Sequence, residues 1–187
     1  MITSKEKIPN FLTMARVALI PILILSFYFE HSITKSEYQI ITVSIFIIAA
    51  ITDYFDGYLS RLWKVESKIG ALMDPIADKL IVTTALALLI DANNAHIIPA
   101  IGILCREIFI SGLREFLAET KVNMPVSWLA KWKTGLQMLA IMILLLSSRT
   151  PDSIVSIVGS VMLWIAFFLT IYTGWLYFKS AKEQKLI

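Results

Sequence analysis

Long apolar stretches separated by short polar breaks run along most of the chain. A helix that crosses a bilayer needs about 20 mostly apolar residues. Six stretches approach that length, and we expect spanning helices at about 10–29, 38–61, 70–90, 97–117, 131–148 and 153–178. The segments 91–94 and 149–152 are short and polar, as is typical of turns between antiparallel helices. The pattern predicts an all-α integral membrane protein with six transmembrane helices, forming a single domain over residues 1–187.

The composition supports a membrane protein and excludes several other classes. Hydrophobic residues make up 57% of the chain and charged residues 17%, whereas soluble domains are less apolar and carry about 25% charge. One Cys and two His leave no disulfide within the chain and no Cys-based zinc site. A bound metal therefore needs oxygen ligands. The net charge of +3 is too small to indicate nucleic-acid binding.

The positive charges predict the orientation in the membrane. With the N-terminus inside, 12 of the 17 Lys and Arg residues fall on inner flanks, two fall on outer loops, and Arg16, Lys79 and Arg106 lie within spans. Cytoplasmic loops are enriched in Lys and Arg. We therefore expect both termini in the cytoplasm.

Four aspartates lie at the cytoplasmic ends of the second and third spans. Asp53 and Asp56 are three residues apart, and Asp74 and Asp78 are four apart, so each pair shares a helix face. Because the two spans are joined by a short link, the pairs should face each other. Ionisable groups in spans are costly and point to a functional site.

Clustered carboxylates need a compensating charge. One interpretation is a structural network with the nearby cations Arg61, Lys64, Lys68 and Lys79. Four acids on two helix faces favour a metal site instead, and oxygen ligands suit Mg²⁺ or Mn²⁺, two ions together being usual in phosphoryl transfer.

Glycines accompany the aspartates. Gly57 follows Asp56 directly, and Gly70 lies one turn before Asp74. Small residues let a ligand or another helix approach the backbone closely. Beside carboxylates we expect ligand approach, whereas Gly102 and Gly159, far from any acid cluster, are expected to be helix contacts.

These residues together resemble a family signature. The pattern is Asp53-x2-Asp56-Gly57-x2-Ser60-Arg61-x8-Gly70-x3-Asp74-x3-Asp78. It is similar to that of the CDP-alcohol phosphotransferases, which reads D-G-x2-A-R-x8-G-x3-D-x3-D after a preceding Asp. Seven of its eight fixed positions match, the departure being Ser60 in place of Ala.

The resemblance implies six transmembrane helices, a homodimer, and displacement of CMP from a CDP-linked donor by a hydroxyl. By matching position, it assigns Asp53, Asp56 and Asp74 to metal binding. Asp78 becomes the base for the acceptor hydroxyl and a further metal contact. The positions expected to lie against the CDP-lipid are Gly57, Ser60, Arg61 and Gly70.

Basic residues further along the chain indicate an acceptor that carries a phosphate. Arg106 and Arg114 are eight residues apart in the fourth span, and Lys131 and Lys133 open the fifth. Such cations suit a phosphate. The other interpretation is that the lysines anchor the helix end at the membrane and that Arg106 belongs to a network with Glu107 or an Asp.

Three further stretches resemble the bacterial phosphatidylglycerophosphate synthase branch of the family. They are Ile8-Pro9-Asn10-x-Leu12-Thr13-x2-Arg16-x4-Pro21, Arg106-Glu107-Ile108 with Gly112-Leu113-Arg114-Glu115, and Lys131-x-Lys133-Thr134-x2-Gln137. This likeness implies CDP-diacylglycerol as donor, sn-glycerol 3-phosphate as acceptor, and an active site on the cytoplasmic side of a bacterial inner membrane. The last span shows nothing specific.

Other functions remain open at this point. Within the family the acceptor could instead be inositol phosphate, serine or phosphatidylglycerol. A cation transporter is a different class, but transport sites usually lie near the membrane midplane, whereas these aspartates lie near one end. A non-catalytic scaffold gives no reason for four clustered acids.

Overall fold

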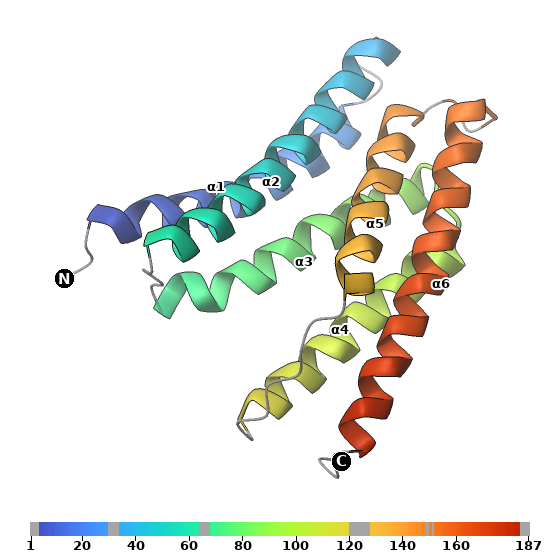
Figure 1. Cartoon of the computed structure of the whole chain (residues 1–187). Coiled ribbons are helices and arrows are strands. Elements are labelled where there is room, and N and C mark those ends of the chain that lie inside the picture. Colours follow the sequence, from blue (N-terminus) through green and yellow to red (C-terminus); the bar gives the residue numbers. More distant parts are fainter. Residues whose placement is uncertain are drawn as a thin grey trace.

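The computed structural model of the chain is a bundle of helices (Figure 1). It describes residues 4–29, 34–63, 68–119, 128–148, 150 and 152–183. Within these ranges the side chains of 4–10 and of more than ten further helix residues, including Asp56, Ser60, Arg61 and Lys131, lie outside the description. The described part contains no strand, and its six helices are α1 (Ser4–Tyr28), α2 (Lys35–Trp63), α3 (Lys68–Asp91), α4 (Ile97–Glu119), α5 (Trp128–Leu146) and α6 (Ile154–Glu183). The all-α prediction is confirmed, and every helix agrees with its predicted range to within about two turns.

The helices form two groups of three. In the first group α1 packs against both α2 and α3, and in the second α6 packs against both α4 and α5. The groups meet where α2 and α3 contact α5 and where α3 contacts α4. Consecutive helices run in opposite directions (Figure 1). The last part of α2 and the first part of α3, which carry the aspartates, therefore lie at the same end of the bundle.

Local sequence signals define two of the helix ends. Thr34 and Glu37 form a capping box at the start of α2: the Glu37 carboxylate accepts from the Thr34 backbone N–H at 3.0 Å, and the Glu37 N–H donates to Thr34 Oγ1 at 3.4 Å. At the end of α3, Asn93 adopts a φ of 55°, and the Asn94 N–H donates to the Leu89 carbonyl at 2.9 Å. This left-handed Asn ends α3 and turns the chain towards α4.

Apolar side chains fill the inside of the bundle and also cover its outside. The core includes Leu23, Phe46, Leu86, Ile103 and Leu144, contributed by α1 to α5 in turn. Many large apolar side chains elsewhere on every helix are exposed. A helix that is apolar on all sides is suited to a lipid environment.

By length and composition, three helices of the described part could cross a membrane: Phe11–Tyr28, Lys35–Leu59 and Ile154–Lys182. α5 holds a shorter apolar stretch, Trp132–Leu146. α3 and α4 are not among these helices, since α3 carries Asp74, Asp78 and Lys79 and α4 carries Arg106, Glu107 and Arg114 within their apolar stretches. Their spanning roles remain predictions.

Two glycines allow close helix contacts, as the sequence predicts. A methyl group on Gly102 of α4 would overlap the ring of Phe167 on α6. One on Gly159 of α6 would lie 2.9 Å from the Leu144 side chain on α5. Both glycines thus let α6 approach its neighbours.

Asn94, in the turn between α3 and α4, joins this turn to α5 and α6 at the end of the bundle opposite the aspartates. Its buried amide nitrogen donates to the Leu144 carbonyl and, at 3.2 Å, to Ser147 Oγ at the end of α5. Its Oδ1 accepts from Ser156 Oγ of α6 at 3.1 Å. A buried amide with partners at the end of α5 and on α6 stabilises the packing of this turn against both helices.

We expect Asn94→Ala to lower the free energy of unfolding by about 2 kcal/mol, because it leaves buried polar partners unpaired. The measurement is the thermal unfolding midpoint in detergent. Asn93→Gly is the matched control, since glycine adopts the same left-handed φ without strain, and it should melt like the unchanged chain. Equal midpoints for Asn94→Ala and the control would contradict this role of Asn94.

Candidate active site

The described aspartates lie on two neighbouring helices. Asp53 is on the second half of α2, and Asp74 and Asp78 are on the first half of α3. The Asp53 side chain is 47% exposed, and Asp74 and Asp78 are partly buried. All three aspartates therefore lie within an apolar bundle and remain accessible from outside it. The side chain of Asp56, one turn after Asp53, lies outside the description.

Helix α1 contacts the aspartates of both other helices in its group. Arg16, which is fully buried, places Nη1 2.9 Å from Asp53 Oδ1. Thr13, also buried, donates a hydrogen bond from its hydroxyl to Asp74 Oδ1. Thr13 and Arg16 are three residues apart and so share one face of α1. This face fixes the positions of two carboxylates on two different helices.

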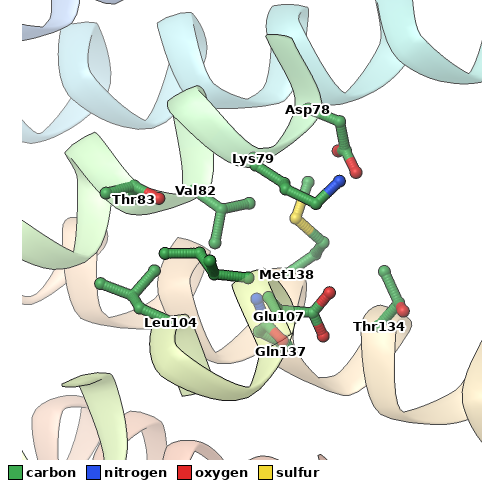
Figure 2. A pocket seen from close by; sticks show the side chains of 10 residues that line it. Asp78, Lys79, Val82, Thr83, Leu104, Glu107, Thr134, Gln137 and Met138 are labelled. Atoms are coloured by element: carbon green, nitrogen blue, oxygen red, sulfur yellow. The ribbon is translucent and has the colours of Figure 1, made fainter. Parts of the chain in front are cut away.

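Asp78 faces a different part of the bundle. It lines a cavity of about 70 Å³ between α3, α4 and α5, together with Lys79, Glu107, Thr134 and Gln137 and several apolar side chains. Figure 2 shows the Asp78 and Lys79 side chains on one wall of this cavity, with Glu107 and Thr134 across from them. Asp78 interacts electrostatically with Asp53, Arg16 and Glu107 as well as with Lys79. It therefore stands between the aspartates beside α1 and the charged groups of α4.

In a structural ion-pair network Lys79 would pair with an aspartate, but its ammonium bonds to a backbone carbonyl instead. Its Nζ donates to the Pro75 carbonyl at 2.9 Å. The bond ends on the backbone of α3 itself, and the ammonium stays at the cavity that Asp78 lines. Lys79 therefore makes no ion pair with the described aspartates, whereas the side chains of Arg61, Lys64 and Lys68, the other cations of that interpretation, lie outside the description.

The described side chains include no group of three or more His, Cys, Asp or Glu placed to hold a metal ion. Asp56, the fourth aspartate expected at the site, is not among those side chains. The chemistry of the donors fits a hard divalent cation, because the candidates are carboxylates on adjoining helices. Asp53 and Asp74 are also each held by α1 through Oδ1, as ligating carboxylates commonly are by neighbouring groups.

Of the positions expected to contact the CDP-lipid, two can be placed. Gly70 is buried near the start of α3, and Gly57 is partly buried near the end of α2. Both are at the end of the bundle that carries the aspartates. The side chains of Ser60 and Arg61 lie outside the description.

The predicted acceptor cations are joined through one carboxylate. Glu107 Oε1 accepts from Arg106 Nη1 at 3.0 Å and also from Lys133 Nζ on α5. Arg106 is 10% exposed and Lys133 is 6% exposed. The structure therefore brings Arg106 and Lys133 together at Glu107. For Arg106 this is the network with Glu107 that the alternative interpretation named, whereas that interpretation made Lys133 a membrane anchor.

Helix α6, in which the sequence indicates nothing specific, completes this network. Arg106 Nη2 donates to Thr173 Oγ1 and Lys133 Nζ to Thr170 Oγ1, both at 3.1 Å. A methyl group on Gly174 would lie 2.9 Å from Arg106 Nε, so glycine leaves room for the guanidinium. Nothing in the local sequence distinguishes these two threonines and this glycine from other small residues of an apolar span.

Of the other two acceptor candidates, only Arg114 can be placed, and it makes a different contact. Arg114 is exposed on α4, and its guanidinium carbon lies 5.8 Å from the centre of the Tyr177 ring of α6. The side chain of Lys131 lies outside the description. Arg106 also borders the apolar groove between α4 and α6 rather than the cavity that holds Asp78.

Comparisons with known proteins agree with the signature. A family model described as CDP-alcohol phosphatidyltransferase matches residues 6–172. Relatives named CDP-diacylglycerol–glycerol-3-phosphate 3-phosphatidyltransferase include one from Rickettsia felis, 46% identical over 95% of this chain and 97% of its own length. One from Haemophilus influenzae is 43% identical over 97% of both chains. The chain belongs to the CDP-alcohol phosphatidyltransferase family.

The ion pair between Arg16 and Asp53 predicts unequal effects of removing its two members. Asp53→Asn takes the carboxylate from a fully buried guanidinium and should lower the free energy of unfolding by roughly 3 kcal/mol. Arg16→Met leaves a half-exposed carboxylate and a well-filled interior, and should cost about 1 kcal/mol or less. Chemical unfolding in detergent measures both.

The double variant Arg16→Met with Asp53→Asn should recover most of the stability that Asp53→Asn loses. Asp152→Asn, which alters an exposed aspartate at the start of α6, is the matched control. Equal losses for the two single variants, or additive losses in the double variant, would contradict this role of the pair.

Proposed function

We propose that the chain transfers a phosphatidyl group from CDP-diacylglycerol to sn-glycerol 3-phosphate, giving phosphatidylglycerophosphate and CMP. The observation that carries the proposal is the placement of Asp78 in a polar cavity, beside the aspartates that complete the family signature. The names of relatives that match over nearly their whole length support this donor and this acceptor.

In this reaction the oxygen of the acceptor's primary hydroxyl attacks the phosphorus that carries the diacylglycerol. A new P–O bond forms there, and the bond from that phosphorus to the CMP oxygen breaks, the electron pair leaving with CMP. Asp78 accepts the hydroxyl proton, as a carboxylate within hydrogen-bond reach can do in the transition state. Its cavity is small, about 70 Å³, which limits the access of competing water.

A divalent metal would be held by Asp53, Asp56 and Asp74, with Asp78 beside them, and we propose Mg²⁺ or Mn²⁺, two ions together. Such ions neutralise the charge of a diphosphate and stabilise the leaving phosphate oxygen. The contribution of the protein is to orient the carboxylates, and the contacts of Arg16 and Thr13 with Asp53 and Asp74 support that role. The family is generally dependent on divalent metals.

The nucleotide end of the donor would lie along Gly57, Ser60, Arg61 and Gly70, the positions that match the signature. The phosphate of the acceptor would be bound by Arg106, Arg114, Lys131 and Lys133. Support for the acceptor set comes from the position of Arg106 and Lys133 around Glu107, whose carboxylate also borders the Asp78 cavity.

We also propose that the chain is a single domain with six spans in a bacterial inner membrane, acting as a homodimer. Both termini and the aspartates would face the cytoplasm. The excess of Lys and Arg at that end supports the orientation.

The direct test gives the purified protein CDP-diacylglycerol, Mg²⁺ or Mn²⁺ and labelled glycerol 3-phosphate. We expect CMP release together with label in the lipid. Release of CMP with inositol phosphate, serine or phosphatidylglycerol but not with glycerol 3-phosphate would support the proposed type of reaction and reject glycerol 3-phosphate as the acceptor. No CMP release with any of these acceptors would reject the proposed function.

Asp78→Asn should reduce turnover by at least about 1,000-fold, because an amide cannot take up the hydroxyl proton. It should leave binding of CDP-diacylglycerol largely intact. Asp91→Asn is the matched control, an exposed aspartate at the opposite end of the same helix, and it should turn over normally. Retained turnover in Asp78→Asn would reject Asp78 as the base.

Arg106→Ala and Arg114→Ala should raise the KM for glycerol 3-phosphate about 10- to 100-fold with a smaller effect on kcat, since each removes a charge-assisted contact to the phosphate. Initial rates at varied acceptor concentration measure this. Lys35→Ala, an exposed cation at the opposite end of the bundle, is the control. An unchanged KM in both variants would reject this acceptor site.

A further inference from the structure

Glu107 contributes both to the network of Arg106 and Lys133 and to the cavity that holds Asp78. Its Oε1 accepts from Arg106 and from Lys133, so this oxygen is committed to the cation network. The same side chain lines the cavity that holds Asp78 and keeps 30% of its surface exposed. Within the described part of the chain, no bond is made to the second oxygen, Oε2.

A hydrogen-bond donor placed at Oε2 would stabilise the Glu107 carboxylate. The cavity wall combines the apolar side chains of Leu104, Ile108, Val82 and Met138 with the polar side chains of Lys79, Thr83, Thr134 and Gln137, and within the described part of the chain none of these bonds to Oε2. A carboxylate in an apolar environment is costly unless its oxygens are hydrogen-bonded. Glu107 therefore favours binding of a small molecule whose hydroxyl can donate a hydrogen bond to Oε2.

The order of groups across the site matches the order of groups in the proposed acceptor. Figure 2 shows Asp78 on one wall of the cavity and Glu107 on the other, and the cations Arg106 and Lys133 adjoin Glu107. Glycerol 3-phosphate carries a reacting hydroxyl, then a second hydroxyl on the next carbon, then a phosphate. With the reacting hydroxyl at Asp78 and the phosphate directed towards the cations, which adjoin Glu107 outside this cavity, the second hydroxyl is the group of the acceptor nearest to the Glu107 carboxylate.

We infer that Glu107 is a specificity-determining residue, which accepts a hydrogen bond from the second hydroxyl of the acceptor. The inference rests on the proposed function. It adds a reason for the enzyme to select a vicinal diol phosphate over a simple alcohol phosphate. A site with a polar group for a substrate hydroxyl discriminates strongly against an analogue that lacks it.

The test compares glycerol 3-phosphate with 3-hydroxypropyl phosphate, which keeps the reacting hydroxyl and the phosphate and lacks the second hydroxyl. The quantity is the ratio of kcat/KM for the two acceptors. We expect a ratio of about 10 to 100 in the unchanged protein, the value of a hydrogen bond to a charged group. In Glu107→Gln the ratio should fall to within a few-fold of one.

This ratio does not depend on how much of a variant is folded, because both acceptors are measured on the same sample. Glu115→Gln, the same change at an exposed position two turns further along α4, is the matched control and should keep the ratio of the unchanged protein. Where Glu107→Gln yields no folded or active protein, Glu107→Asp, which shortens the side chain by one carbon, should lower the ratio as well.

A ratio that stays unchanged in the Glu107 variants, with equal losses for both acceptors, would overturn the inference and leave Glu107 as a positioning residue for the two cations. A ratio near one in the unchanged protein would also overturn it. Failure of the proposed function is a different result: the unchanged protein would then use neither acceptor.

Discussion

The buried ion pair between Arg16 and Asp53 is the contact on which the arrangement of the site depends. A guanidinium inside an apolar bundle is tolerated when an opposite charge lies against it, and the Asp53 carboxylate provides that charge at 2.9 Å. The pair ties α1 to α2, and the bond from Thr13 to Asp74 ties the same face of α1 to α3. Helix α1 therefore sets how the two helices that carry the family signature face each other.

The same constraint operates in the second group of helices. Arg106 and Lys133 are almost fully buried and share the Glu107 carboxylate, while Thr173 and Thr170 each accept one further bond from them. Asp78 lies between the two networks and interacts electrostatically with members of both. In the proposed reaction, one group of helices thus holds the donor and its metal, the other holds the acceptor, and the proton passes at the boundary between them.

The fold and the end of the bundle that carries the site could be predicted from sequence, because both follow from local patterns. Apolar stretches give the helices, and the spacing of Asp53, Asp74 and Asp78 gives one face and one end. The roles of Arg16 and of Thr170 and Thr173 could not be predicted. The partner of a buried charge lies on a helix far away in the chain, and a threonine in an apolar span has the same local pattern whether it faces a lysine or its own backbone. Gly174 shows the same limit, since its contact with Arg106 depends on how α4 and α6 pack.

The central claim is that the aspartates held by α1 form the metal site at which a CDP-linked donor reacts. The most direct measurement is an experimental structure of the protein with Mn²⁺ and CDP-diacylglycerol, in which anomalous scattering locates the manganese. We predict anomalous peaks bounded by Asp53, Asp56, Asp74 and Asp78, with the donor's diphosphate against them and Arg16 still paired with Asp53. Manganese bound elsewhere in the bundle, or a diphosphate away from these carboxylates, would contradict the claim.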